Sequence, residues 1–124
     1  MHETVIAQQV VRAVLAEMDS RGASACKSID IDLGQLEGLN PQDLQAAFDL
    51  EAADTVLDGA VLQVSLMPAT AVCPSCQAAK PFEPPHGHAH EIPRAVCPDC
   101  GSALELRGGR GFIIRRAALV LEDP

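Results

Sequence analysis

Four cysteines in this chain have the spacing that binds a metal ion. They form two C-x-x-C pairs, Cys73 with Cys76 and Cys97 with Cys100, and twenty residues separate the pairs. Each pair directs two sulfurs towards one point, and two pairs complete the tetrahedral shell of a structural zinc site. Gly101 follows the second pair, where a left-handed residue lets backbone amides point at the thiolates. The sequence therefore predicts a closed Cys₄ zinc site with a structural role.

Redox chemistry and disulfides explain these cysteines less well. A thioredoxin-like pair requires one C-x-x-C at a strand-to-helix turn, and two pairs in a proline-rich segment do not offer that. No signal peptide and no membrane span is visible, so we expect a cytoplasmic protein, in which thiols stay reduced. The fifth cysteine, Cys26, lies apart and is predicted to be a small buried apolar residue.

The first three residues, Met1-His2-Glu3, are a second candidate metal site. The size of His2 predicts that Met1 is retained. The α-amine of Met1, the deprotonated amide nitrogen of His2 and its imidazole can then form fused chelate rings, which the Glu3 amide could complete to a plane. Planar nitrogen coordination suits Ni(II) or Cu(II), and the Glu3 carboxylate could hold the ring from outside. From these residues alone, a frayed terminus that binds nothing is the alternative.

Three further histidines, His86, His88 and His90, alternate in the segment between the cysteine pairs. In extended backbone they would point to one side and could form an auxiliary site for nickel, zinc or copper. The favoured alternative is a solvated, proline-flanked loop in which they bind nothing. A third alternative is that one histidine replaces a cysteine in the zinc shell when a thiolate is protonated.

The composition limits the partners. Nine Lys and Arg stand against seventeen Asp and Glu, for a net charge of -8. This balance argues against binding to nucleic acid or to anionic membrane surfaces, both of which require a basic face. Hydrophobic residues make up 48% of the 124 residues, with three Phe and no Trp or Tyr. We therefore expect one domain with an aliphatic core, alone or with a small appendage.

Two helices are predicted to position these residues. An apolar stripe predicts a helix over Val5–Arg21, with Thr4 as N-cap and residues 1–3 projecting from its start. A second helix is predicted from Pro41 to about Ala53, with Asn40 as N-cap. Its predicted apolar side consists of Leu44, Ala47, Phe48, Leu50 and Ala52.

Strands are predicted over residues 28–33, 60–67 and 112–121, with 34–38 as a loop. Leu62, Val64 and Leu66 share one face of the second strand, and the third strand is expected to return to the same sheet. Seven of the nine prolines lie between Pro68 and Gly111, a stretch that needs a metal to hold it together. The predicted fold is α+β. Residues 1–68 and 112–124 form a three-stranded sheet with two helices, and residues 69–111 form a zinc-ribbon-like lobe with two knuckles.

The order of these motifs resembles the HypA/HybF family of nickel metallochaperones over nearly the full length. The most specific parts of the resemblance are Met1-His2-Glu3 and the two knuckles with Gly101. Further matching segments are Ala7-Gln8, residues 31–38 (IDLGQLEG), Pro41, the helix from Leu44 to Phe48, and Gly59-Ala60.

The resemblance implies delivery of nickel for maturation of [NiFe]-hydrogenase and, in some organisms, of urease. It implies nickel bound by the N-terminus and His2 with help from Glu3, and structural zinc bound by Cys73, Cys76, Cys97 and Cys100. The implied partners are a HypB-type nickel GTPase and the hydrogenase large subunit. The long proline-rich connections are also compatible with a domain-swapped homodimer.

Two other classes of function remain as alternatives. A zinc-ribbon interaction module, related to transcription and without nickel transfer, is supported only by Arg107, Arg110, Arg115 and Arg116 after the second knuckle. These arginines suit a solvated strand face or a partner contact better. A small zinc enzyme using the histidine segment would need an open coordination position. We expect no enzyme, because the sequence shows no nucleophile with a base and no phosphate loop.

Overall fold

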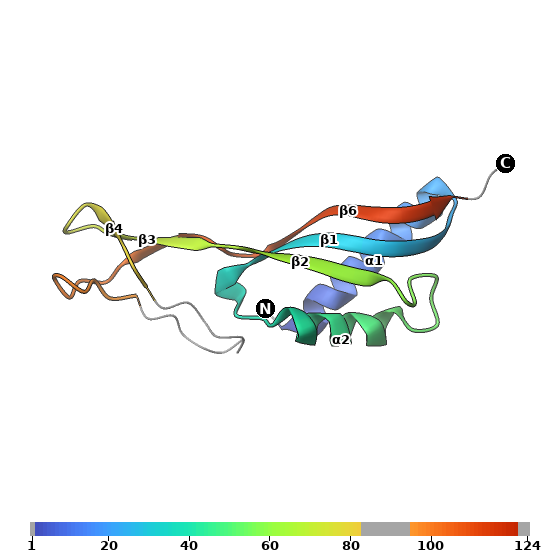
Figure 1. Cartoon of the computed structure of the whole chain (residues 1–124), viewed down its shortest axis with the longest axis horizontal. Helices are drawn as coiled ribbons and strands as arrows, with labels where there is room; N and C mark the ends of the chain where they lie inside the picture. The colour runs from blue at the N-terminus through green and yellow to red at the C-terminus, as the bar shows by residue number, and fades with distance from the viewer. Residues whose placement is uncertain (1, 83–94, 122–124) are drawn as a thin grey trace.

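The computed structural model describes residues 2–82 and 95–121, which form two helices, one 3₁₀ turn and six strands (Figure 1). The first sheet has the order β2-β1-β6 and the second has the order β4-β3-β5. The elements are α1 (Glu3–Arg21), β1 (Ala23–Gly34), η1 (Gln35–Glu37), α2 (Pro41–Ala52), β2 (Val61–Met67), β3 (Ala69–Cys73), β4 (Ala78–Lys80), β5 (Glu105–Gly108) and β6 (Phe112–Leu121).

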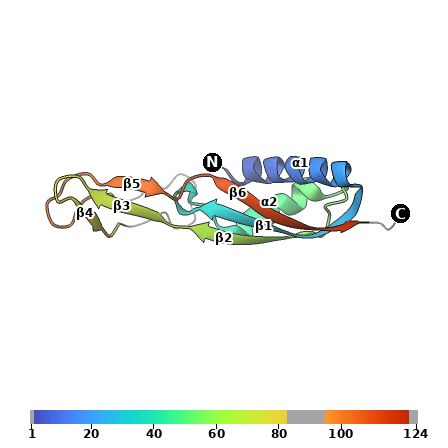
Figure 2. The same ribbon diagram turned by 90° about the horizontal axis from the view of Figure 1, so that it is seen from above.

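Both helices cover one face of the first sheet, and the second sheet extends from the end of the first (Figures 1 and 2). β1 is the central strand, parallel to β2 and antiparallel to β6. This confirms the predicted α+β fold and the return of the last predicted strand to the first sheet. Within the described residues, no helix has the length and apolar character needed to cross a lipid bilayer.

Helix α1 presents the predicted apolar stripe to the core, where Ile6, Val10 and Met18 are almost fully buried. The helix begins at Glu3, and its N-cap is His2, so the prediction of Thr4 as N-cap is wrong. The carbonyl of His2 accepts hydrogen bonds from the N–H groups of Val5 (3.1 Å) and Ile6 (3.3 Å). The acidic Glu3 is favourable in the first turn of a helix, and His2 caps the helix through its backbone carbonyl.

Helix α2 begins as predicted. Asn40 is its N-cap, its side chain accepts a hydrogen bond from the N–H of Gln42 (2.7 Å), and Pro41 occupies the first turn. Leu44, Phe48 and Ala52 are buried and Ala47 packs against them, but Leu50 is 80% exposed. The prediction that Leu50 belongs to the apolar side is wrong, because two residues at about 100° each carry it to the opposite side from Phe48.

Strand β1 starts at Ala23 and is longer than the predicted strand over 28–33. Ile29, Ile31 and Leu33 point into the core, and Cys26 is buried at 7% exposure, as predicted. Burial raises the pKa of the Cys26 thiol, although a backbone hydrogen bond to Ser28 opposes this. The edge of β2 is protected by α2, because the Gln45 side chain accepts a hydrogen bond from the N–H of Leu62 (2.8 Å).

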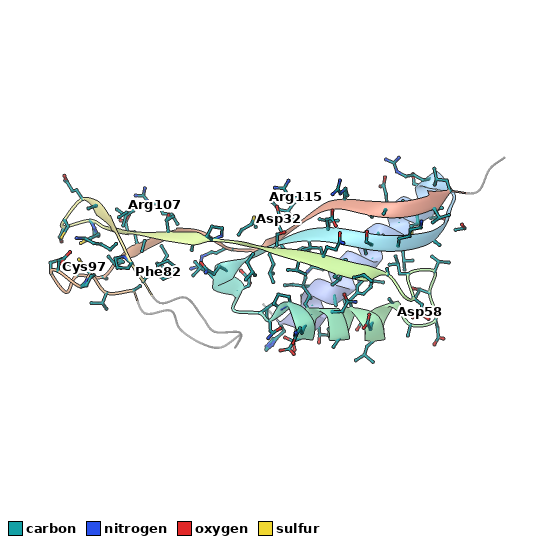
Figure 3. All side chains as sticks on the ribbon, viewed as in Figure 1. Asp32, Asp58, Phe82, Cys97, Arg107 and Arg115 are labelled. Atoms are coloured by element: carbon teal, nitrogen blue, oxygen red, sulfur yellow. The ribbon has the colours of Figure 1, made fainter. Side chains whose placement is uncertain are left out.

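The opposite face of the first sheet carries two aspartate–arginine pairs, of which Asp32 and Arg115 are labelled in Figure 3. A register shift between Asp30 and Ile31 leaves Arg115 as an extra residue in β6. Because of this bulge, consecutive arginines both reach β1. Arg115 donates to Asp32, which is 7% exposed, and Arg116 donates to Asp30 (2.6 Å). Both arginines are thus solvated at the strand face and ion-paired within the chain.

The chain passes twice between the two sheets, at residues 67–69 and 108–112, and residues 34–37 bind both passages. We call these three segments the inter-sheet joint. Two of its bonds are between backbone groups: Gly34 N–H donates to Gly111 O and Leu36 N–H donates to Gly109 O, both at 2.7 Å. The segment predicted as a loop is therefore the fixed point to which the second passage is bonded.

Two side chains of η1 complete the inter-sheet joint. Gln35 Oε1 accepts the N–H of Ala69 (3.1 Å), and Glu37 Oε2 accepts the N–H of Gly111 (2.9 Å). Burial alone would raise the pKa of Glu37, but the Gly111 N–H and the positive charges nearby, Arg110 among them, outweigh burial and lower the pKa. The charged carboxylate therefore stabilises the joint above its ordinary pKa, and this contribution is lost as the pH falls through the lowered value.

Glycine is required at two positions of the joint. A Cβ on Gly34 would lie 2.4 Å from the carbonyl oxygen of Gly109, and a Cβ on Gly109 would lie 2.7 Å from the Cβ of Ala69. Gly109 also has a φ of +68°, which disfavours other residues. The second passage thus lies at contact distance from Gly34 and, at Ala69, from the first passage.

We predict that Gly109→Ala destabilises the protein more than Gly111→Ala. Both glycines have similar positive φ values, +68° and +75°, but only Gly109 lacks space for a methyl group. Gly111→Ala should cost about 1–2 kcal/mol for the left-handed backbone, and Gly109→Ala a further ~1–3 kcal/mol for overpacking. Urea unfolding followed by circular dichroism measures both. Equal losses in the two variants would show that close packing does not restrain the joint.

Candidate metal centres

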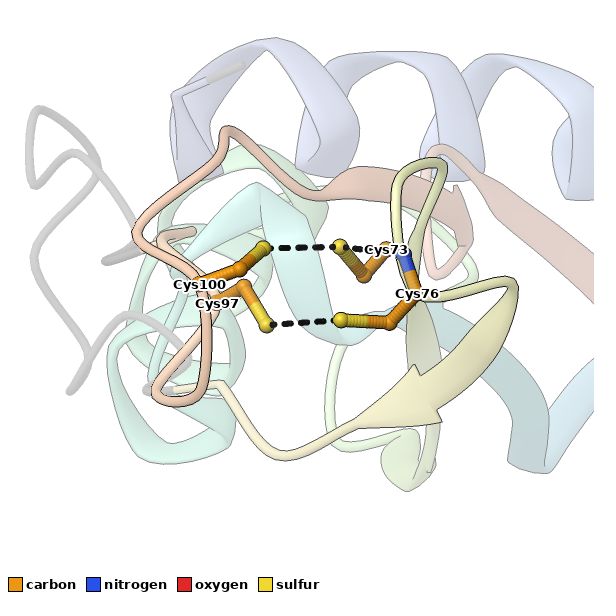
Figure 4. A group of neighbouring side chains, drawn as sticks. All are labelled: Cys73, Cys76, Cys97 and Cys100. Carbon is orange, nitrogen blue, oxygen red and sulfur yellow. Dashed lines mark hydrogen bonds between the residues drawn. The ribbon is translucent and has the colours of Figure 1, made fainter.

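The structure brings the four predicted cysteines together at the far end of the second sheet (Figure 4). Their four sulfurs all lie within 4.8 Å of one another. The Sγ atoms of Cys73 and Cys100 are 3.5 Å apart, and those of Cys76 and Cys97 are 4.0 Å apart. A tetrahedron with Zn–S bonds of about 2.3 Å has sulfur–sulfur edges of about 3.8 Å. The donor set and its dimensions therefore suit one tetrahedral ion.

The two knuckles are closed by equivalent backbone hydrogen bonds. In the first, Gln77 N–H donates to Cys73 O (2.8 Å), and in the second, Gly101 N–H donates to Cys97 O (2.9 Å). Gln77 and Gly101 both have left-handed backbone, with φ values of 56° and 75°. The prediction for Gly101 is confirmed. Gln77 occupies the equivalent position after the first knuckle. Because it is not glycine, its residue type gave no signal for a left-handed backbone.

Among the described residues, the lobe around the cysteines has a very small core. Its buried cluster consists of Ala71, Cys73, Cys97 and Leu104, with Phe82, Ala95 and Leu106 packed against it. By contrast, seventeen buried residues make the core under the first sheet. Half of the candidate metal-binding sulfurs thus belong to the buried cluster of the lobe, and Cys76 and Cys100 are exposed. A bound ion would join the two knuckles more strongly than this cluster can.

The exposed thiols have different proton affinities. Hydrogen bonds from the Ser102 hydroxyl and backbone, with smaller contributions from neighbouring sulfurs, lower the pKa of Cys100 to about 6. Hydrogen bonds with Cys100 and Cys73 raise the pKa of Cys76 to about 12. Without metal, Cys100 is therefore the thiolate that is ready for an incoming cation at neutral pH. Sequence analysis missed Ser102, although its position two residues after Cys100 was available as a signal.

At the other candidate site, the structure describes His2 and Glu3, and Met1 lies outside the described residues. His2 is exposed at the start of α1 with extended backbone (φ -81°, ψ 150°), and Glu3 is half-buried. Glu3 lines a shallow pocket of about 300 Å³ between the helices, together with Asp43 of α2. The sequence gave no signal for Asp43 at this site, because only the packing of α1 on α2 brings it there.

The third group of candidate residues, His86, His88 and His90, lies outside the described residues. Within the part of the chain that the structure describes, the cysteines form the one group of three or more His, Cys, Asp or Glu able to share an ion. The auxiliary histidine site thus stays a prediction.

Fold and site together define a class: a small α+β protein with a two-knuckle tetrathiol centre in a separate lobe. Comparison with known proteins identifies the family within this class. The family model described as "Hydrogenase/urease nickel incorporation, metallochaperone, hypA" matches residues 1–119. The chain therefore belongs to the HypA family.

Relatives with known names agree with this assignment. The chain is 32% identical to the hydrogenase maturation factor HypA of Chlorobium limicola over 118 residues, which is 93% of each chain. It is 34% identical to that of Streptomyces avermitilis over 112 residues, 89% of this chain and 80% of the relative. The solution structure of the nickel metallochaperone HypA from Helicobacter pylori matches with a TM-score of 0.62 at 17% identity, covering 98% of this chain and all of that one, and so shares the fold.

We predict that Cys100 of the metal-free protein is the first thiol to be alkylated. At pH 7 a pKa of about 6 makes it about nine-tenths thiolate. Iodoacetamide should label Cys100 at least about tenfold faster than Cys76, which is also exposed, even after allowing for the lower nucleophilicity of a low-pKa thiolate. Labelling should slow as the pH falls through 6, and buried Cys26 should react later than Cys100. Peptide mass spectrometry over time measures each rate.

The control variant is Ser102→Ala, which removes the hydroxyl that donates to Cys100. It should slow labelling of Cys100 and leave Cys26 unchanged. Equal labelling rates at Cys76 and Cys100 would contradict this account of the thiol electrostatics.

Proposed function

We propose that this protein is a nickel metallochaperone that binds Ni(II) at its N-terminus and delivers it for maturation of [NiFe]-hydrogenase, with urease as a further client. The observation that carries this proposal is the match of residues 1–119 to a family described by nickel incorporation into these enzymes. The net charge of -8 gives no support to a nucleic-acid-binding alternative. Three of the four arginines after the second knuckle, Arg107, Arg115 and Arg116, are paired with carboxylates.

The nickel ligands in this proposal are the Met1 amine with the imidazole and amide nitrogen of His2, and Glu3 assists. The start of α1 suits this role. The first N–H groups of an α-helix make no hydrogen bonds within the helix, so amide coordination there breaks no turn. His2 is accessible, and its carbonyl remains bonded to Val5 and Ile6. The helix would thus anchor a chelating end without being unwound by it.

The proposed role of the cysteine centre is structural zinc. The four sulfurs have the dimensions of a ZnS₄ shell and leave no open position for a substrate. Cys73 and Cys76 would hold the ion from one knuckle, and Cys97 and Cys100 from the other. Zinc bound there supplies cross-linking and no catalysis. The protein is accordingly proposed not to be an enzyme.

Partners and compartment follow from the same proposal. A HypB-type nickel GTPase would supply or receive nickel, and the hydrogenase large subunit would be the final acceptor. These exchanges take place in the cytoplasm. The homodimer through domain swapping remains part of the proposal, to be tested by light scattering of the zinc-loaded protein.

We predict that the zinc-loaded protein with an untagged native N-terminus binds one Ni(II) and that His2→Ala abolishes this binding. Loss of the imidazole breaks the fused chelate rings, so no planar complex can form. Calorimetry gives the stoichiometry, and the visible d–d band reports planar geometry. The matched control replaces His86, His88 and His90 by Ala and should bind nickel as the parent does. If the control loses nickel and His2→Ala retains it, the N-terminal site is wrong.

We also predict that removing zinc exposes the backbone amides of the lobe to exchange with solvent and leaves those of the first sheet protected. The lobe has a small apolar cluster of its own, whereas the first sheet has a large core. Hydrogen exchange after chelation should show rapid exchange of the β3 and β5 amides, with β1 and α1 still protected. Loss of protection throughout would contradict the predicted division into residues 1–68 with 112–124 and residues 69–111. Full protection of the lobe would contradict a structural role for zinc.

A further inference from the structure

An ion pair between Lys80 and Asp99 joins the two knuckles. The Nζ of Lys80 lies 2.5 Å from Oδ2 of Asp99. Lys80 is the last residue of β4, the strand that follows the first knuckle, and Asp99 lies between the two cysteines of the second knuckle. The pair therefore connects the elements that hold the two halves of the cysteine centre.

The strand register places Lys80 on the cysteine side of the second sheet. Lys80 is opposite Ala71, and Ala78 is opposite Cys73. Because cross-strand partners share a face, Lys80 lies on the same face as Ala71 and Cys73, both of which are buried in the lobe cluster. The Lys80 side chain is only 14% exposed, which is unusual for lysine. The hydrogen bond to Asp99 raises the pKa of Lys80 against the opposing effect of burial, and the negative charges of Asp99, Cys76 and Cys97 raise it further.

The two members of the pair are unequally exposed to water. The Asp99 side chain is 67% exposed, against 14% for Lys80. Water and salt therefore screen the carboxylate far more than the ammonium group. Four thiolates around a divalent ion carry more negative charge than the ion neutralises. The centre is thus left with excess negative charge, and the less screened group beside it is positive.

We propose that Lys80 is the counter-charge of the cysteine centre: placed on the sulfur side of the sheet by the register of β4, it stabilises the metal-bound thiolates and slows release of the ion. The inference rests on the proposed zinc site and adds to it a residue that contacts no metal. Lys80 acts through the sulfurs of Cys76 and Cys97 and is therefore a positioning and electrostatic residue, with no part in nickel binding.

The test is zinc release from the purified full-length protein to a chromophoric chelator, measured by stopped flow. Groups around metal ligands typically change metal affinity by about 10- to 100-fold, and Lys80→Met should accordingly release zinc at least about tenfold faster than the parent. Lys80→Arg keeps the charge and should show a clearly smaller change. Lys27→Met, at an exposed lysine of β1, is the matched control and should release zinc at the parent rate.

Asp99→Asn separates a charge effect from a simple cross-link between the knuckles. It removes the ion pair but leaves the Lys80 charge in the lobe, so its effect should be smaller than that of Lys80→Met. Asp99→Asn releasing zinc as fast as Lys80→Met would overturn the counter-charge role, and so would parent-like release by Lys80→Met. Circular dichroism checks the fold of each variant, and Lys80→Gln replaces Lys80→Met if the latter does not fold.

Cobalt substitution distinguishes failure of this inference from failure of the zinc site. Parent protein loaded with Co(II) should show the intense thiolate charge-transfer band of a tetrahedral S₄ centre. Absence of that band in the parent would rule out the proposed zinc site and, with it, this inference. Its presence in the parent and in Lys80→Met, with equal rates of zinc release, would overturn only the role of Lys80.

Discussion

The inter-sheet joint is the constraint on which the arrangement of both candidate centres depends. Residues 34–37 end the central strand of the first sheet and bind both passages to the second sheet through Gly34, Leu36, Gln35 and Glu37. The same short segment leads into Asn40 and α2, which packs on α1 below the proposed nickel site. One 3₁₀ turn thereby sets the position of the cysteine lobe and also of the helix pair.

The two parts of the molecule are stabilised by different physical means. The first sheet has an aliphatic core of seventeen buried residues beneath two helices. The cysteine lobe has four among its described residues, two of which are metal-ligand candidates. Apolar burial therefore contributes less to its order, and the backbone bonds of the knuckles contribute more. In the proposed function, one chain thereby combines a rigid base with a lobe whose stability depends on metal.

Local patterns in the sequence predicted much of this fold. Helical periodicity identified α1 and α2, Asn40-Pro41 identified a helix start, and two C-x-x-C pairs identified the sulfur cluster. Patterns failed where tertiary contacts or backbone choices decide. Thr4 is a better capping residue than His2 in general, yet the helix begins two residues earlier than predicted, at Glu3. One such contact is the bulge that aligns Arg115 and Arg116 with two aspartates, and another is the close approach of Gly34 and Gly109 in the joint. Both depend on residues more than seventy positions apart.

The position of β6 in the chain has a consequence for biosynthesis. β6 forms the most extensive pairing of the first sheet with β1, but it is translated after the whole cysteine lobe. At ribosomal rates of about 5–20 residues per second, the lobe adds about 2–9 seconds between synthesis of Met67, which ends β2, and of Phe112, which begins β6. During that interval the β1 residues Ile29, Ile31 and Asp32 lack their neighbour strand. The length of the lobe therefore sets how long that unfinished sheet stays open to chaperones and proteases.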